Sequence, residues 1–163
     1  MRCARGFTLV EMLVALVVLA VGMLGVSRLF VYVLQGNVSA GSRAAAVDLA
    51  ADMADRIRAN RNATAAYAAA SPITAVPGTV CVGGAPGAVN CSATQMAAYD
   101  LYQWDAQVRC TAAASKCWGA GPSWTVTYTA SATGTPPNTY AITINWVEQA
   151  TAQALSYTLD VQI

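Results

Sequence analysis

The sequence predicts an α+β fold in which one long N-terminal helix packs on a C-terminal antiparallel sheet. Two observations predict it. Residues 7–61 are apolar almost without interruption at first and then apolar at helical spacing, whereas apolar and polar residues alternate strictly in three segments within residues 124–163. Alternation with a period of two belongs to strands, and a period near 3.6 belongs to helices. A loop region with cysteines and a short second helix are expected between them.

The first half of the long helix is predicted to span a membrane. The segment 7–27 contains 21 residues, and its only polar side chains are Thr8, Glu11 and Ser27. As a helix it spans roughly 32 Å at about 1.5 Å per residue, which is enough to cross a bilayer. A carboxylate costs about 2.5–3.5 kcal/mol near the centre of such a helix, so Glu11 is expected either to have a partner or to reach water at the headgroup boundary.

The flanking charges predict the orientation of this membrane segment. Arg2 and Arg5 precede it and no acidic residue does, so the positive-inside rule places the N-terminus in the cytoplasm and the remainder of the chain outside. A cleaved secretory signal ending near residues 38–40 is the alternative. The apolar segment is longer than the usual signal core of about 7–15 residues and contains Glu11, which argues against that alternative.

The second half of the helix, residues 29–61, is predicted to lie outside the membrane. It lacks proline, and an apolar stripe recurs at helical spacing at Ala46, Ala50, Met53 and Ile57. Asp52 and Arg56 are four residues apart, which predicts a surface ion pair. Glycines at positions 36 and 41 are expected to disturb the helix locally.

Residues 62–163 are predicted to form one globular domain. Its first part, to residue 90, is rich in alanine, proline and glycine and is expected to be irregular loop. Ser92 and Gln95 then form a capping box for a short helix with one apolar face at Ala97, Leu101, Trp104 and Val108. Three strands of an antiparallel sheet follow, within residues 124–129, 140–146 and 155–163.

Five cysteines indicate how this domain is braced. Cys3 lies at the extreme N-terminus, and the other four are Cys81, Cys91, Cys110 and Cys117. Four cysteines allow three pairings. An exported domain favours oxidation, and the local pairs, Cys81 with Cys91 and Cys110 with Cys117, are the favoured pairing. A zinc site is disfavoured because the cysteines lack paired CxxC spacing.

The composition excludes several functions. The chain has no histidine, which removes triad hydrolysis and histidine-ligated metal chemistry. Nine basic and eight acidic residues, without a basic cluster, give no nucleic-acid footprint. The acids Asp48, Asp52 and Asp55 have helical spacing and are expected to be surface charges. We therefore predict no catalytic residue, no cofactor and no metal site.

All four tryptophans lie beyond residue 100, which raises the alternative of a ligand-binding or adhesive surface. Trp104, Trp124 and Trp146 fall on predicted apolar faces and are expected in the core. Trp118 follows a cysteine in a loop with glycine and proline, and it is the one expected to make an exposed contact.

The string GFTLVEMLVALVVLAVGMLG resembles the class III signal of type IV prepilins and of type II secretion pseudopilins. The resemblance implies cleavage by prepilin peptidase between Gly6 and Phe7, removal of the leader 1–6 and methylation of the new amino group of Phe7. It also implies that Glu11 attracts the amino group of Phe7 on a neighbouring subunit during assembly, an ion pair formed in low dielectric.

Three stretches resemble the PilV family of minor pilins, also called type IV pilus modification proteins: the N-terminal string, MAAYDLYQW and YAITINWVE. The resemblance implies a pilin-like fold and a low-abundance subunit, held by one span in the inner membrane with its domain in the periplasm, that joins other minor pilins and the major pilin to prime assembly. It would reach the pilus on the cell surface, with a role at the tip or in adhesion. The alternatives are a minor pseudopilin of type II secretion and an unassembled membrane-anchored enzyme or binding protein.

Overall fold

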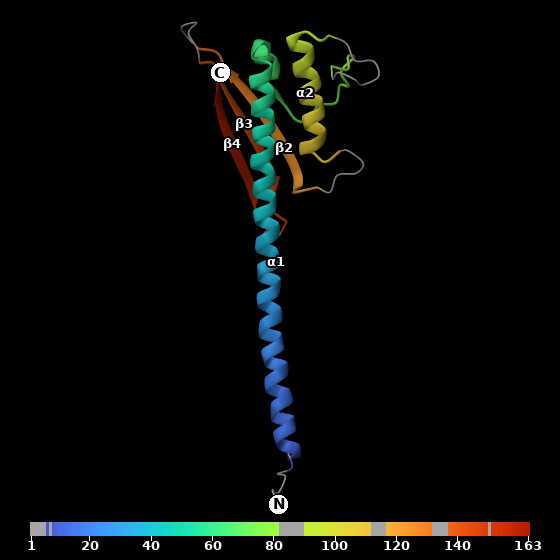
Figure 1. Ribbon diagram of the computed structural model, residues 1–163, viewed down its shortest axis with the longest axis vertical. Coiled ribbons are helices and arrows are strands. Elements are labelled where there is room, and N and C mark those ends of the chain that lie inside the picture. Colours follow the sequence, from blue (N-terminus) through green and yellow to red (C-terminus); the bar gives the residue numbers. More distant parts are fainter. Residues whose placement is uncertain (1–5, 7, 82–89, 112–116, 132–136, 150) are drawn as a thin grey trace, which may run out of the picture. The chain divides into compact units, whose positions relative to one another are not determined.

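The computed structural model describes residues 6, 8–81, 90–111, 117–131, 137–149 and 151–163 (Figure 1). The chain divides into two compact units, Met1–Val38 and Ser39–Ile163. The predicted α+β architecture is confirmed: the described residues form a long N-terminal helix, a shorter second helix and a four-stranded antiparallel sheet.

Helix α1 runs from Leu9 to Ala59, 51 residues, and contains an apolar window long enough to cross a membrane, with a mean hydropathy of 2.6. The expected disturbance at Gly36 and Gly41 is wrong, because the helix passes through both positions without a break. A glycine costs only about 1 kcal/mol relative to alanine in a helix interior, which is too little to interrupt a helix whose neighbouring turns are intact.

The C-terminal part of α1 belongs to the globular unit and supplies one wall of its core. The predicted stripe of Ala46, Ala50, Met53 and Ile57 is confirmed, since all four side chains are fully buried, and Ala54 joins them. The small alanines allow the helix to lie close to the elements it packs on, while Met53 and Ile57 fill the space between them.

The segment after α1 is more ordered than its composition predicts. A 3₁₀ helix, η1, spans Arg61–Tyr67, and a two-residue strand, β1, spans Ala69–Ala70. Tyr67 is fully buried in the core, and β1 pairs with β2. Alternation over two alanines is too short to predict a strand, so β1 exists only because β2 offers it a free edge. Residues 82–89 of the expected loop lie outside the described residues.

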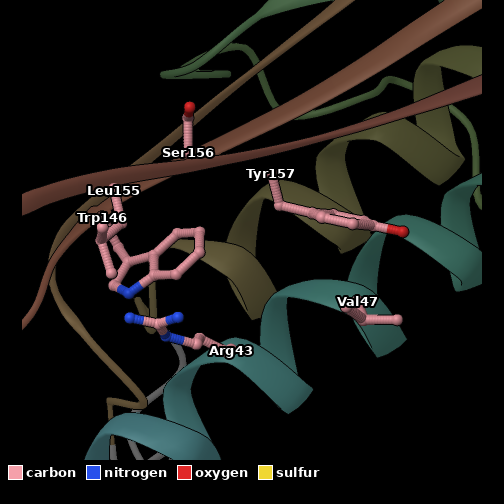
Figure 2. A pocket seen from close by; sticks show the side chains of 6 residues that line it. All are labelled: Arg43, Val47, Trp146, Leu155, Ser156 and Tyr157. Carbon is pink, nitrogen blue, oxygen red and sulfur yellow. The ribbon is translucent and has the colours of Figure 1, made fainter.

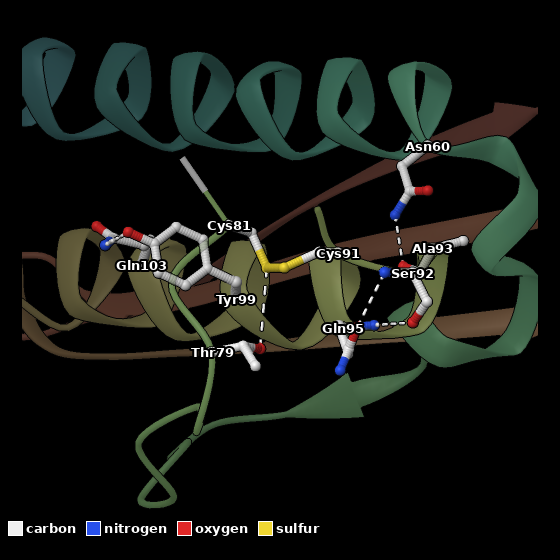
Figure 3. The surroundings of a disulfide bond; sticks show 9 residues. All are labelled: Asn60, Thr79, Cys81, Cys91, Ser92, Ala93, Gln95, Tyr99 and Gln103. Atoms are coloured by element: carbon white, nitrogen blue, oxygen red, sulfur yellow. Dashed lines mark hydrogen bonds between the residues drawn. A yellow bond between two sulfur atoms is a disulfide. The ribbon is translucent and has the colours of Figure 1, made fainter. Parts of the chain in front are cut away.

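Helix α2 runs from Ala93 to Val108 and begins at the predicted capping box (Figure 3). The Ser92 hydroxyl accepts from the Gln95 backbone nitrogen at 3.3 Å, and the Gln95 side chain accepts from the Ser92 nitrogen at 2.9 Å. These bonds satisfy backbone N–H groups that the first turn of a helix leaves unpaired. The predicted apolar face of α2 is buried, with Ala97, Trp104 and Val108 fully so.

Two disulfides flank α2: Cys81 is joined to Cys91 and Cys110 to Cys117, the two local pairs favoured from the sequence. The first disulfide lies at the N-terminal end of α2 (Figure 3). In the same region the side-chain nitrogen of Asn60, the residue before η1, donates a hydrogen bond to the Ala93 carbonyl. Each disulfide therefore closes a short loop next to a helix end.

Removing the first disulfide gives a stability prediction. A Cys81→Ser, Cys91→Ser chain should lose about 2–3 kcal/mol of unfolding free energy, because the bond closes a loop of sequence separation 10 and restricts the unfolded chain. Urea unfolding of the full chain in detergent, followed by tryptophan fluorescence, measures this. Cys3→Ser, at a cysteine outside both pairs, is the control. Equal urea midpoints for the double variant and this control would contradict the prediction.

The sheet has the order β1-β2-β3-β4, and every neighbouring pair is antiparallel. Strand β2 spans Ala120–Thr129, β3 spans Thr139–Val147 and β4 spans Ala154–Gln162. The inward residues of β2 and β3 are buried as their alternation predicts, and Trp124, Ile142, Ile144 and Trp146 lie in the core. On the edge strand β4 only Val161 is fully inside, while Leu155, Tyr157 and Leu159 are half-buried.

Candidate functional site

The predicted processing and assembly residues lie at the start of α1. Gly6 is exposed, and Phe7 lies outside the described residues. Thr8 is the residue before the helix, and its hydroxyl accepts from the Glu11 backbone nitrogen at 3.3 Å. Thr8 and Glu11 therefore have the spacing and half of the bonds of a capping box. The motif that resembles a processing signal thus also starts the helix.

The Glu11 side chain is exposed in the single chain and has no ion-pair partner among the described residues. It lies in the first turn, where the helix dipole favours a negative charge. No basic side chain in the described part of α1 forms an ion pair with the Glu11 carboxylate. Within the part of the chain that the structure describes, the Glu11 carboxylate therefore has no ion-pair partner.

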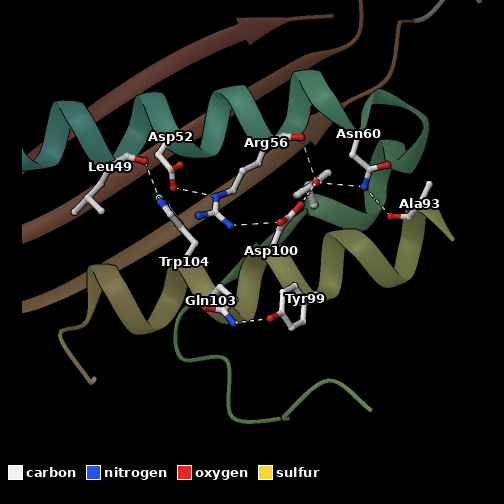
Figure 4. Close-up of polar contacts among 10 residues, drawn as sticks. Leu49, Asp52, Arg56, Asn60, Ala93, Tyr99, Asp100, Gln103 and Trp104 are labelled. Carbon is white, nitrogen blue, oxygen red and sulfur yellow. Dashed lines mark hydrogen bonds and ion pairs between the residues drawn. The ribbon is translucent and has the colours of Figure 1, made fainter. Parts of the chain in front are cut away.

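In the globular unit, a polar cluster joins α1 to α2 and η1 (Figure 4). Arg56 Nε lies 2.9 Å from Asp52 Oδ2, which confirms the predicted pair, and Arg56 Nη1 lies 3.4 Å from Asp100 on α2. The Tyr67 hydroxyl donates to Asp100 at 2.6 Å. The predicted surface pair is therefore one side of a half-buried network.

Burial, together with the hydrogen bond to the Asp100 carboxylate, raises the pKa of Tyr67 well above its usual value. The phenol consequently stays protonated and remains a donor throughout the physiological range. The sequence contains no signal for this contact, because Tyr67 and Asp100 are brought together only when η1 and α2 pack side by side.

A second carboxylate, Asp105, is buried between α2 and the sheet. Its Oδ1 accepts from the Trp124 indole nitrogen at 2.8 Å, and its Oδ2 lies 3.2 Å from Arg109 Nη1. Asp105 is only 3% exposed. A buried carboxylate is tolerated when it is both paired and hydrogen-bonded, and Asp105 meets both conditions through Arg109, four residues further along the chain, and Trp124.

The third carboxylate, Glu148, follows β3 and is 4% exposed. The hydroxyls of Ser39 on α1 and Thr151 donate to it, the latter at 2.7 Å, and Arg43 Nη2 lies 3.6 Å from its Oε1. The pKa of Glu148 is held below its usual value, first by the hydrogen bond from Ser39 and then by that from Thr151. The positive charge of Arg43 makes a smaller contribution in the same direction. Glu148 thereby ties the turn between β3 and β4 to α1.

This lowered pKa gives a prediction for acid stability. Because the folded pKa is below the unfolded one, Glu148 stabilises the fold above its unfolded pKa of about 4.5, and the contribution is lost as the pH falls through the lower folded value. Glu148→Gln should therefore be less stable than the original chain at pH 7, and the difference should shrink below about pH 4.5. Urea midpoints from pH 7 to pH 3 measure it, and Asp160→Asn is the control at an exposed carboxylate. A difference independent of pH would contradict this assignment.

Trp118 is not the exposed contact that the sequence predicted. Its ring lies 5.6 Å from that of Trp146, and its indole nitrogen donates to the Val108 carbonyl at 3.2 Å. Its own carbonyl accepts from the buried Ser42 hydroxyl on α1 at 2.6 Å. These contacts hold Trp118 against the core, whereas Trp104, Trp124 and Trp146 are buried as expected.

Comparison with known proteins now adds to these features. Residues 29–102 match the family model described as type IV pilin Tt1218, and residues 1–27 match the model of the prokaryotic N-terminal methylation motif. No curated protein and no solved structure gave a significant match. The chain therefore carries a type IV pilin domain behind a class III prepilin motif, which implies processing by prepilin peptidase and assembly with other pilins.

Proposed function

We propose that this chain, a type IV pilin domain behind an N-terminal methylation motif, is a minor pilin of the PilV kind that helps to prime pilus assembly. The observation that carries the proposal is the succession of the two matches, residues 1–27 and then residues 29–102, with helix α1, Leu9–Ala59, running from the first match into the second. Pilins are structural rather than catalytic proteins, and the proposed role needs no catalytic residue.

In this proposal the leader 1–6 is removed after Gly6 and the new amino group of Phe7 is methylated. Residues 7–28 lie in the inner membrane. Residues 29–61 and the globular domain 62–163 lie in the periplasm until assembly carries the subunit into the pilus. The exposed first turn of α1, with Glu11 unpaired among the described residues, supports an intermolecular use of that carboxylate.

Assembly would convert an isolated carboxylate into a paired one. A charge within an apolar helix costs about 2.5–3.5 kcal/mol near the bilayer centre. When the helix moves into a bundle of pilin helices, the amino group of a neighbouring Phe7 would offset that cost and fix the axial register between subunits. The other minor pilins and the major pilin are the proposed partners, through α1.

The test is the mass of the N-terminal peptide from native cells, taken from membranes and from sheared pili. The expected result is an N-methylated peptide beginning at Phe7 in both fractions, at a low ratio to the major pilin. A peptide beginning at Met1 despite an active peptidase, or one beginning near Gly41, would refute the proposal.

Deletion of the chain separates the pilus from the secretion alternative. The proposal expects fewer surface pili, with weaker twitching and adhesion, and unchanged secretion of exoproteins. Lost secretion with normal piliation would instead identify a minor pseudopilin of a type II system. Both outcomes are read from the same deletion strain, and restoring the chain from a plasmid controls for effects on neighbouring genes.

A further inference from the structure

A small cavity of about 220 Å³ lies between α1 and the edge strand β4 in the globular unit (Figure 2). Its walls are mostly apolar, formed by Val47 of α1 with Leu155 and Tyr157 of β4, and Trp146 of β3 closes it from the inside. Ligand sites for cofactors usually measure about 300–1,000 Å³, so this cavity fits a group the size of one side chain.

The cavity contains a polar group without a partner. Trp146 is 4% exposed, and its indole nitrogen has no hydrogen-bond acceptor among the described residues. Figure 2 shows this nitrogen turned toward the guanidinium of Arg43. Two donors thus face each other, although a buried tryptophan N–H usually has an acceptor. One acceptor placed between the indole nitrogen and the guanidinium would serve both donors.

Arg43 has donors left for such an acceptor. Its described ion pair, Nη2 with Glu148 Oε1, measures 3.6 Å, beyond the usual hydrogen-bond distance, and the same oxygen already accepts from Ser39. A guanidinium carries five N–H donors. The Trp146 nitrogen is covered by neighbouring atoms. The Arg43 side chain that faces it in Figure 2 is 61% exposed and is therefore free to move when a group enters.

The chemistry of the walls indicates which acceptor fits. A carboxylate can accept from the indole N–H and from the guanidinium at once, and it neutralises the positive charge. The apolar walls suit a short aliphatic stem. Aspartate and glutamate side chains combine these two features.

The position of the cavity indicates where that side chain comes from. It opens beside β4, the last strand of the described sheet, whose outer edge has no neighbouring strand there, and beside Val47, which is 43% exposed. An incoming protein would cover both. Resting on the proposed pilin function, we propose that the cavity receives an aspartate or glutamate side chain of a neighbouring pilin subunit, which Arg43 and Trp146 bind together.

The carboxylate chemistry is tested first, on the full chain in detergent micelles with ¹⁵N-labelled tryptophan. Isobutyrate is titrated against its neutral counterpart isobutyramide, and the Trp146 indole signal is assigned from its absence in Trp146→Phe. The proposal expects a saturable shift with isobutyrate, affinity roughly tenfold weaker in Arg43→Gln, and no change in Arg58→Gln. Arg58 is the matched control because it lies on the same helix with a similar exposure of 57%. Equal shifts with both compounds would overturn the proposal.

The protein that supplies the acidic side chain is identified by crosslinking in native cells. A photoreactive amino acid is placed at position 47 and, in a separate chain, at position 19 of the apolar half of α1. The expected result at position 47 is a crosslink to a pilin peptide that contains an acidic residue, roughly tenfold weaker with Arg43→Gln and unchanged with Arg58→Gln. Crosslinks to pilins from position 19 without such a product at position 47 would overturn this inference and leave the pilin function standing. Absence of pilin crosslinks at both positions would overturn both.

Discussion

Replacing Trp104 by alanine should lower the unfolding free energy of the globular unit by about 3–5 kcal/mol, the largest effect expected of a single core substitution in this chain. Trp104 is fully buried, its ring lies 4.9 Å from that of Trp124, and its indole nitrogen donates to the Leu49 carbonyl of α1 at 2.9 Å (Figure 4). The substitution removes the ring that fills the space between α1, α2 and the sheet and also deletes a polar contact between the two helices.

Urea unfolding of the full chain in detergent, followed by tryptophan fluorescence, measures this loss. All four tryptophans lie in the globular unit, so the signal reports on it alone. Gln107→Ala, at an exposed position of α2, should stay within about 0.5 kcal/mol of the original chain. Trp104→Phe should fall between the two. A loss below about 1 kcal/mol for Trp104→Ala would show that the core collapses around the missing ring.

Glu11→Gln should remove the chain from assembled pili while leaving its globular unit folded. The substitution keeps the size of the side chain and deletes the charge that is proposed to pair with the amino group of Phe7 on a neighbour. Leaving one partner of a buried ion pair unpaired costs about 3–5 kcal/mol, so recovery in sheared pili should fall at least roughly tenfold. The protein should accumulate in the inner membrane instead.

Quantitative blotting of membrane and sheared fractions measures the distribution. Asp48→Asn is the matched control, since it deletes an exposed carboxylate from the same helix beyond the apolar segment, and it should assemble normally. Unfolding curves for Glu11→Gln should match those of the original chain, because Glu11 belongs to the N-terminal unit, Met1–Val38, and not to the globular unit that tryptophan fluorescence reports on. Equal amounts of the Gln variant and the original chain in sheared pili would refute the assembly role of Glu11.

Elements with strong local signals could be predicted closely. The Ser92 and Gln95 capping box begins α2 as expected, and strict alternation identifies β2, β3 and β4 to within a few residues. These predictions succeed because backbone periodicity and helix capping depend on residues within one or two turns of each other. The N-terminal motif is also local, so it indicates the prepilin class without any knowledge of the remaining fold.

Contacts between distant residues were missed for the opposite reason. Tyr67 with Asp100, Trp124 with Asp105 and Ser39 with Glu148 are separated by 33, 19 and 109 residues, and no pattern in the sequence links their members. Each buries a polar group whose cost has to be offset by a partner, and the partner is supplied by a different element. The same holds for β1, whose two alanines form a strand only against β2.

The sequence by itself therefore determined the apolar helix, the match of residues 1–27 to the N-terminal methylation motif, the three long strands and the capped second helix. Only the tertiary structure decided which carboxylates are buried and held, that Trp118 packs on the core, and that Arg43 faces Trp146 across an apolar cavity. The physical reason is the separation along the chain of the residues involved. Hydrophobic periodicity depends on residues within a few consecutive turns, whereas hydrogen-bond partners and cavities exist only where separate elements meet.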